Sequence, residues 1–497
     1  MRPASDLFGT ALAADDLNAV LEALHIASID LYGDSYGSWF SQAFAVRHPD
    51  KLRSLVLDGT YPVSGLNPWY PELTGAAYHA FNATCERNAN CASLPGTSMD
   101  RLTALLGELR AHPFRGTGHD ANGNPHDVIA NPASLAYLFY GNGPVEVLYH
   151  DMDAAARALL EEGDRAPLLR LLAENGVSSS GYGSYKELSN AIFVAVSCLD
   201  YPQIYDVASP PALRFGQEAA AITGQNPAIY SPFTIGEFRA MPLFVSLLDM
   251  CLTWPSPSPA HPPVSAIPPG AVFPAVPTLA LSGELDTLTP AKQGAEAAAL
   301  FPNARHIVFA NSFHVDALGD EFDCASAIVR RFVETLQPGD TSCAAAIPEV
   351  RTVPRFATGF RQIPPAAPAA GNSGTEADLR ASAAAVLTAG DAVARWWVNT
   401  SGFGVGLRGG QAQYALDGDT VRIQLTDSAW VNDLPVSGAI TWTPFENGGL
   451  VTADLSFPSP SGTASLHAAW RDKVSHPAAA LTGTIGGRAI AAAMPAP

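Results

Sequence analysis

The sequence predicts an α/β fold built on a parallel sheet, followed by a separate β-rich region. Apolar runs typical of buried strands alternate with helical runs near the N-terminus and again before residue 340. Pro- and Gly-rich stretches set these parts apart from a C-terminal region of short alternating strands. We therefore expect one parallel sheet made from two distant parts of the chain, with a large insertion between them.

Composition favours a folded protein of two or three domains. The 497 residues are 47% hydrophobic, and 47 acidic against 28 basic side chains give a net charge of −19. This charge disfavours nucleic acid and anionic membrane surfaces as partners. No apolar stretch is long enough to span a bilayer, and residues 1–9 have neither the length nor the apolar core of a secretory signal.

The six cysteines point instead to export into an oxidising compartment. None forms a C-x-x-C motif and no histidine-rich segment accompanies them, so no metal is expected. Neighbours in sequence give the pairs Cys85–Cys91, Cys198–Cys251 and Cys324–Cys343. Six cysteines allow about fifteen connectivities, and a set of buried free thiols is the alternative.

The segment GDSYG, residues 33–37, fits the pattern G-x-S-x-G. Residues 26–33 read as a buried strand, residues 36–48 as a helix, and residues 52–59 as the next strand. A serine at the tip of a sharp strand-to-helix turn needs small neighbours, which the two flanking glycines provide. The context makes Ser35 a candidate nucleophile, with an ordinary glycine-rich turn as the alternative.

A serine nucleophile in such a turn needs an acid and a histidine later in the chain, in that order. Asp286 follows a predicted strand at residues 278–281, and His314 follows the next strand at residues 306–310. The C-terminal ends of parallel strands meet at one edge of a sheet, so both side chains are expected beside Ser35. The sequence therefore predicts Ser35, Asp286 and His314 as a catalytic triad.

Other acids near these positions are given lesser roles. Asp58 also ends a strand, but Asp286 is preferred as the acid, and Asp58 is expected to cap the next turn. Asp34 is expected to be solvated or to cap a helix. Glu284 lies one step further inside its turn than Asp286 and is the reserve acid.

These segments resemble the α/β-hydrolase fold. The likeness lies in LYGDSYGSWFSQAFAVRHPDKLRSLVLDGTYP, LALSGELDTLTP and NSFHV. More narrowly, the chain is similar to the secreted tripeptidyl aminopeptidase and prolyl aminopeptidase group, whose C-terminal region resembles CASAIVRRFVETLQPGDTSCAAAIPEVRTVPRF. The likeness covers roughly residues 10–357 apart from a variable middle. It implies a cofactor-free serine exopeptidase in which Ser35 attacks, His314 is base and acid, and Asp286 orients it.

The chain departs from that group at its start. Members place several strands and an HGGPG-type loop ahead of the helix that residues 7–26 are expected to form. By analogy, that portion holds half of the sheet and one oxyanion donor, which leaves the backbone N–H of Tyr36 as the donor expected here. We expect a shortened reading frame, a chain impaired in activity or folding, and a secreted or cell-envelope parent.

The pattern and the resemblance together divide the chain into five segments. They are 1–60, the first part of the hydrolase core; 61–275, a mostly helical cap; 276–357, the second part of the core; 358–377, a linker; and 378–497, a small β-sandwich. A cap over the serine excludes water and restricts entry. The resemblance implies that a cap acid holds the substrate's amino group, and the spacing selects none of Glu187, Asp200 and Asp249.

The C-terminal segment leaves its role open: wall or carbohydrate attachment, a cover for the catalytic domain, or a dimer contact. Exposed tryptophans would favour carbohydrate, but Trp430, Trp442 and Trp470 are expected in the core of this segment. For the whole chain, the resemblance implies an aminopeptidase acting on peptides with a free N-terminus. The alternatives are an esterase of small acyl esters, or a non-catalytic remnant or binding protein. The oligomeric state is not predicted.

Overall fold

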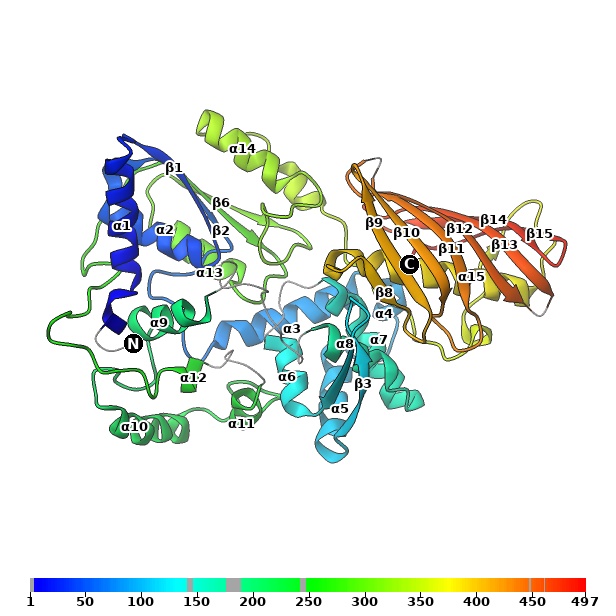
Figure 1. Cartoon of the computed structure of the whole chain (residues 1–497), viewed down its shortest axis with the longest axis horizontal. Coiled ribbons are helices and arrows are strands. Elements are labelled where there is room, and N and C mark those ends of the chain that lie inside the picture. Colours follow the sequence, from blue (N-terminus) through cyan, green and yellow to red (C-terminus); the bar gives the residue numbers. More distant parts are fainter. Residues whose placement is uncertain (1–3, 141–145, 176–188, 242–246, 447, 460) are drawn as a thin grey trace. The chain divides into compact units, whose positions relative to one another are not determined.

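The computed structural model divides the chain into two compact units (Figure 1). The residues described are 4–140, 146–175, 189–241, 247–446, 448–459 and 461–497. The first unit comprises residues 1–80, 132–145 and 180–347, and the second comprises residues 81–131, 146–179 and 348–497. The insertion that we expected as one cap is thus shared between the two units.

A four-stranded parallel sheet in the order β1-β2-β5-β6 is the centre of the first unit (Figure 1). Its strands are β1 (Ile29–Asp34), β2 (Leu52–Asp58), β5 (Thr278–Gly283) and β6 (Ala304–Phe309). The register pairs Asp34 with Asp58, so β1 and β2 end side by side. The prediction that two distant parts of the chain build one parallel sheet is confirmed.

Helices bury both faces of this sheet, as a parallel sheet requires. They are α1 (Thr10–Ala23), α2 (Tyr36–Arg47), α13 (Ala291–Ala298) and α14 (Ala325–Thr335). Leu279 and Leu281 of β5 pack with Phe332 of α14, whereas Ala280 between them packs with Ala45 of α2. This alternation of sides along β5 follows from the two-residue period of a strand.

The rest of the first unit is helical, as expected for the insertion. Its helices are the start of α3 (Pro71–Glu86), α6 (Pro132–Tyr140), α9 (Asn190–Asp200), α10 (Pro211–Gly224), α11 (Ile235–Arg239) and α12 (Leu247–Met250). A disulfide between Cys198 and Cys251 joins α9 to the residue after α12. A second disulfide, Cys324–Cys343, closes the segment that contains α14.

The second unit combines part of the insertion with the C-terminal region. The insertion contributes the end of α3, α4 (Ala89–Ala92), α5 (Ser98–Ala111), β3 (Phe114–His119), β4 (Pro125–Ala130), α7 (Glu146–Glu162) and α8 (Ala166–Glu174). The C-terminal region contributes α15 (Glu376–Ala394) and a nine-stranded antiparallel sheet (Figure 1). Two residues of the expected linker, Ala367 and Pro368, form the edge strand β7 of that sheet.

The nine strands lie in the order β7-β15-β14-β13-β12-β11-β10-β9-β8. Their bounds are β7 (Ala367–Pro368), β8 (Phe403–Val405), β9 (Gln411–Asp417), β10 (Thr420–Ser428), β11 (Val436–Thr443), β12 (Leu450–Ser459), β13 (Gly462–Arg471), β14 (Ala478–Ile485) and β15 (Arg488–Pro495). Helix α15 contacts β10, β11, β12 and β15. The predicted β-rich domain is confirmed, but a helix takes the place of the second sheet expected in a sandwich.

The alternating burial of the strands explains this packing. In β10, Val421, Ile423 and Leu425 are buried, and the residues between them are exposed. Trp442 of β11 and Trp470 of β13 pair with Val451 of β12 from its two neighbouring strands, and both are buried. Trp430 is buried as well. The expectation that the three tryptophans lie in the core is confirmed. No described helix is both long and apolar enough to cross a membrane.

Candidate active site

Ser35 lies in the sharp turn between β1 and α2. Its backbone has φ 49° and ψ −120°, a strained conformation for a residue with a side chain. Its N–H donates to the carbonyl of Asp58 at 2.8 Å, and its own carbonyl accepts from the Ser38 hydroxyl at 2.6 Å. The turn is therefore anchored to the neighbouring strand on one side and to the first turn of α2 on the other.

The glycine two residues before Ser35 is required by close packing. A Cβ atom on Gly33 would lie 2.1 Å from the carbonyl oxygen of Gly37 and 2.4 Å from the Ser41 hydroxyl oxygen. The first of these neighbours is backbone, which cannot rotate away. The glycine pattern that indicated a nucleophile turn thus has a steric basis.

We expect the substitution Gly33→Ala to lower the free energy of unfolding by about 2–3 kcal/mol, since the added methyl group overpacks this turn. Urea unfolding measures the change. Gly216→Ala is the matched control, because Gly216 lies in α10 of the same unit with no atom within 4 Å of an added Cβ. The free energy of unfolding of this control should rise by about 0.5–1 kcal/mol, because alanine has a higher helix propensity than glycine. Equal stability in the two variants would contradict the steric argument.

Asp286 and His314 meet at the ends of β5 and β6. Nδ1 of His314 lies 2.8 Å from Oδ2 of Asp286. The second carboxylate oxygen accepts the backbone N–H groups of Leu288 and Thr289 at 2.7 and 2.8 Å. The Thr289 hydroxyl donates to Oδ2 at 2.6 Å and lies 3.0 Å from Nδ1. Every polar contact of this carboxylate therefore favours its ionised form.

The charges of the pair support each other. Burial acts to raise the pKa of Asp286, but His314 and the hydrogen bonds from Thr289 outweigh it and hold the pKa below its ordinary value. Burial acts to lower the pKa of His314, and the negative charge of Asp286, then those of Asp58 and Asp34, raise it above its ordinary value. The side chain of Asp286 is fully buried and that of His314 is 10% exposed.

His314 lies near the turn that carries Ser35. A Cβ on Gly59 would be 2.8 Å from Cε1 of His314, and Gly59 directly follows Asp58, whose carbonyl holds Ser35. Within the described part of the chain, which includes both side chains, no hydrogen bond joins Ser35 Oγ to the imidazole. The structure thus brings Asp286 and His314 into contact and places Ser35 after β1, which β2 separates from β5 in the same sheet.

Tyr36 is the first residue of α2, where backbone N–H groups have no partner inside the helix. Its hydroxyl lies 2.8 Å from the Thr10 hydroxyl, which in turn donates to Asp200 at 2.7 Å. These contacts tie the side chain to the start of α1 and the end of α9. The role of the Tyr36 N–H as an oxyanion donor stays a prediction.

The competing acids have other partners. The expectation that Asp58 caps a turn is wrong: it accepts the Tyr32 hydroxyl and the backbone N–H groups of Asp316 and Ala317. Glu284, the reserve acid, accepts the N–H of Asn311 at 3.0 Å. Neither carboxylate contacts the His314 ring. The contact between Thr289 and the Asp286–His314 pair was not predicted, although the spacing D-x-x-T offered a signal for it.

Two of the three possible amine-binding acids can be placed. Asp200 accepts both the N–H and the hydroxyl of Thr10, at 2.8 and 2.7 Å, and burial raises its pKa. Asp249 forms an ion pair with Arg239 at 2.5 Å. Glu187 lies outside the described residues. The charge of Asp249 is thus already matched, which leaves Asp200 as the acid without a cationic partner among those placed.

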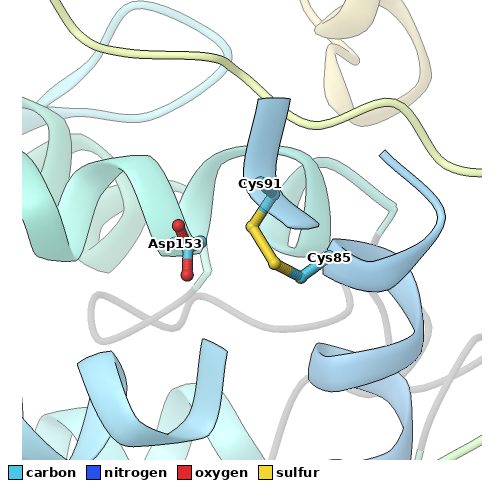
Figure 2. Close-up of side chains that lie close together, drawn as sticks. All are labelled: Cys85, Cys91 and Asp153. Atoms are coloured by element: carbon cyan, nitrogen blue, oxygen red, sulfur yellow. A yellow bond between two sulfur atoms is a disulfide. The ribbon is translucent and has the colours of Figure 1, made fainter. Parts of the chain in front are cut away.

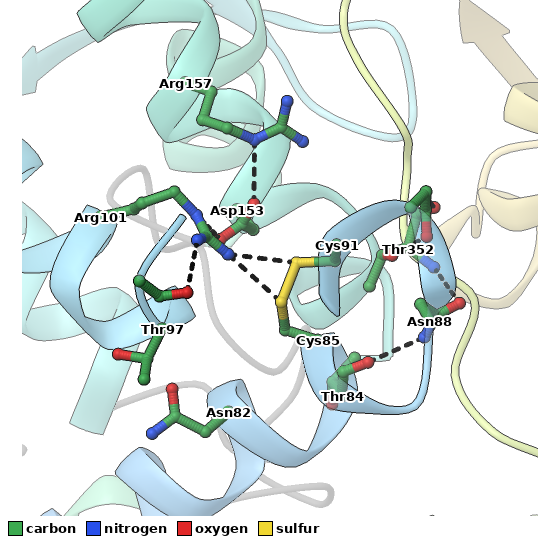
Figure 3. Close-up of a disulfide and its surroundings, with 12 residues drawn as sticks. Asn82, Thr84, Cys85, Asn88, Cys91, Thr97, Arg101, Asp153, Arg157 and Thr352 are labelled. Carbon is green, nitrogen blue, oxygen red and sulfur yellow. Dashed lines mark hydrogen bonds and ion pairs between the residues drawn. A yellow bond between two sulfur atoms is a disulfide. The ribbon is translucent and has the colours of Figure 1, made fainter. Parts of the chain in front are cut away.

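One group of potential metal-binding side chains occurs among the described residues: Cys85, Cys91 and Asp153 of the second unit (Figure 2). The two sulfurs form a disulfide and so offer no thiolate. Arg101 donates to both sulfurs at 3.2 and 3.3 Å and to Asp153 at 2.8 Å, and Arg157 donates to the same carboxylate at 3.0 Å (Figure 3). A guanidinium group therefore occupies the place of a cation here.

All three predicted disulfide pairs are confirmed, with Cα–Cα separations of 5.1, 5.4 and 5.9 Å. These three disulfides use all six cysteines of the sequence, so no cysteine is free. Structural disulfides persist in oxidising compartments. The covalent pattern is therefore consistent with an exported protein.

Comparison with known proteins supports the hydrolase assignment. Residues 1–82 match the family model of the alpha/beta hydrolase fold, and residues 239–343 match that of TAP-like proteins. The chain is 26% identical over 341 residues to the serine protease Hip1 of Mycobacterium tuberculosis and of Mycobacterium bovis. That alignment covers 64% of this chain and 59% of the relatives' length.

Two other similarities are weaker. A 2-hydroxymuconate semialdehyde hydrolase from a Pseudomonas species is 36% identical over 83 residues, 14% of this chain and 29% of that protein. Among solved structures, a thermophilic esterase from Thermogutta terrifontis aligns with a TM-score of 0.25 at 14% identity, over 66% of this chain and 74% of that one. The two family matches and the protease relative support an α/β-hydrolase of the TAP-like group.

Proposed function

We propose that this protein is a serine hydrolase that removes residues from peptides with a free N-terminus, through an acyl-enzyme on Ser35. The observation that carries the proposal is the buried Asp286–His314 pair at the strand ends beside the Ser35 turn. The protease relative favours a peptide over other acyl substrates. The three disulfides favour action of the full-length protein outside the cytoplasm.

The proposed reaction is acyl transfer in two steps. Asp286 binds Nδ1 of His314, which leaves Nε2 to take the proton of Ser35 as its Oγ attacks the peptide carbonyl carbon. The N–H of Tyr36 donates to the resulting oxyanion. His314 then protonates the leaving amine, the C–N bond breaks, and water attacks the acyl-enzyme by the same proton route. The reaction needs no cofactor.

The pH dependence follows from the charge state of His314. The ring must be neutral to accept the serine proton, and its neighbours raise its pKa above the ordinary value of about 6.5. We expect kcat/KM to fall as the pH is lowered through this raised pKa, so the acid limb has its midpoint above that value. Rate measurements across pH test this. A midpoint below that value would contradict the proposed environment of His314.

A substrate comparison tests the reaction class. The kcat/KM for peptidyl nitroanilides with a free amino group should exceed that for their N-acetylated counterparts. Nitrophenyl esters are compared in the same assay. Loss of the preference for a free N-terminus would exclude an aminopeptidase. Hydrolysis of the esters alone would make the protein an esterase. Absence of Ser35 labelling by a fluorophosphonate probe in the folded protein would favour a non-catalytic role.

A further inference from the structure

A second carboxylate acts on the histidine from outside the proposed triad. Asp58 ends β2 and is completely buried. Its oxygens accept the Tyr32 hydroxyl at 2.6 Å and the backbone N–H groups of Asp316 and Ala317 at 3.0 and 2.8 Å. All three groups donate to Asp58, and two of them belong to the loop that carries His314.

That loop, residues 310–317, is anchored at both ends. Before His314, the N–H of Asn311 donates to Glu284 at 3.0 Å, and the carbonyl of Ser312 accepts the N–H of Leu285 at 2.9 Å. After His314, Asp58 supplies the acceptors for two consecutive N–H groups. Backbone N–H groups that stay unpaired in a buried region are destabilising, so this side of the loop depends on Asp58.

Asp58 and Asp316, two buried acids that lie close together, differ in the hydrogen bonds that they accept. The Asp316 side chain is buried and accepts only the Ser312 hydroxyl, at 2.6 Å. Burial, and then the charge of Asp58, raise the pKa of Asp316 well above its ordinary value. Burial also raises the pKa of Asp58, but its three donated hydrogen bonds counteract this. The hydrogen-bond donors therefore favour a negative charge on Asp58 more than on Asp316.

We infer that Asp58 is a positioning residue for His314: it holds the loop by two backbone hydrogen bonds and places a second negative charge near the imidazole. This inference rests on the proposed role of His314. The charged groups that act on the ring are Asp286, Asp58 and Asp34. Asp286 touches the ring, whereas Asp58 acts through the backbone and through space. The histidine thus has two carboxylate supports from two different strands.

Three variants separate these effects. Asp58→Ala removes both the acceptors and the charge. Asp58→Asn keeps an acceptor oxygen and removes the charge. Asp316→Asn is the matched control, because it changes a neighbouring buried acid of the same loop to an amide of nearly the same shape. Thermal unfolding establishes that each variant is folded before its readouts are compared.

The readouts are the rate at which a fluorophosphonate labels Ser35 across pH, and an NMR titration of the His314 ring in protein labelled with ¹³C-histidine. His314→Ala assigns the signal. We expect Asp58→Ala to lower the labelling rate by up to about 100-fold through misplacement of the ring, and Asp58→Asn to recover part of it. In both Asp58 variants the midpoint of the His314 titration should lie at lower pH than in the wild type. In Asp316→Asn it should be unchanged.

An unchanged His314 midpoint in folded Asp58→Asn would overturn the inference, as would an equal shift in Asp316→Asn. The titration needs no activity, so it still decides the matter if Asp58→Ala fails to fold or if the wild type is not labelled. Absence of labelling in the wild type, with the His314 midpoint still dependent on Asp58, would reject the proposed function and leave the support of the ring by Asp58 intact.

Discussion

Replacing Ser35 by alanine is expected to lower turnover by about 10⁶-fold, because no acyl-enzyme can form without the hydroxyl. The fold should not change. In the described part of the chain the hydroxyl of Ser35 makes no hydrogen bond, and the anchors of the turn are its backbone N–H and carbonyl groups. Alanine keeps both anchors. The kcat/KM of a peptidyl nitroanilide and the melting temperature together measure the two expectations.

Ser64→Ala is the matched control for this experiment. Ser64 is exposed in the same unit, and the substitution removes the same atom. It should retain both turnover and fluorophosphonate labelling, whereas Ser35→Ala should lose both. Turnover that survives in Ser35→Ala would assign the activity to another nucleophile or to a contaminant. Loss of turnover together with a large fall in melting temperature would instead indicate a structural role for the hydroxyl.

The local part of the site was predictable from sequence because its constraints are local. The turn at Ser35 needs a glycine at position 33, as the Cβ clash there shows, whereas a Cβ on Gly37 would meet only Asp34, at 3.7 Å. Asp286 and His314 could be found because each follows a strand, and parallel strands end at one edge. The disulfide pairs were predictable for a similar reason: each joins cysteines that are neighbours among the six in sequence order.

Contacts between residues far apart in the sequence could not be predicted from the sequence pattern. Asp58 reaches backbone N–H groups 258 and 259 residues away, and nothing near it in sequence specifies them. Likewise, the alternation in β10 shows that one face is buried, but not whether a sheet or a helix covers it. The packing of α15 against the sheet is also set by tertiary contacts and was not predicted.

A buried cluster of charges links the insertion helices of the second unit to α15. In the second unit, Arg395 at the end of α15 contacts three carboxylates: Asp151 of α7, Glu174 of α8 at 3.1 Å and Asp391 of α15 at 2.7 Å. Arg170 of α8 contacts Asp151 at 3.1 Å and Asp391 at 2.9 Å. The two arginines therefore join three helices that are up to 244 residues apart.

We expect Arg395→Ala to lower the free energy of unfolding of the second unit by about 3–5 kcal/mol, since it leaves buried carboxylates without half of their positive charge. The five side chains of the cluster are at most 6% exposed, so water cannot replace the guanidinium. Hydrogen exchange of peptides from the second unit, followed along a urea series, measures the change. Tryptophan fluorescence would not isolate this unit, because Trp39 and Trp254 are buried in the first unit.

Arg422→Ala is the matched control for Arg395→Ala. Arg422 pairs with Asp417 in the same unit, but the two side chains are 58% and 67% exposed. Exposed ion pairs contribute between zero and about 1 kcal/mol, so this variant should unfold close to the wild type. Equal losses in the two variants would contradict the role of burial. Labelling of Ser35 followed along the same urea series separates two further outcomes. If labelling is lost at the urea concentration at which the second unit loses its exchange protection, the two units unfold together. If labelling persists, the first unit is stable without the second.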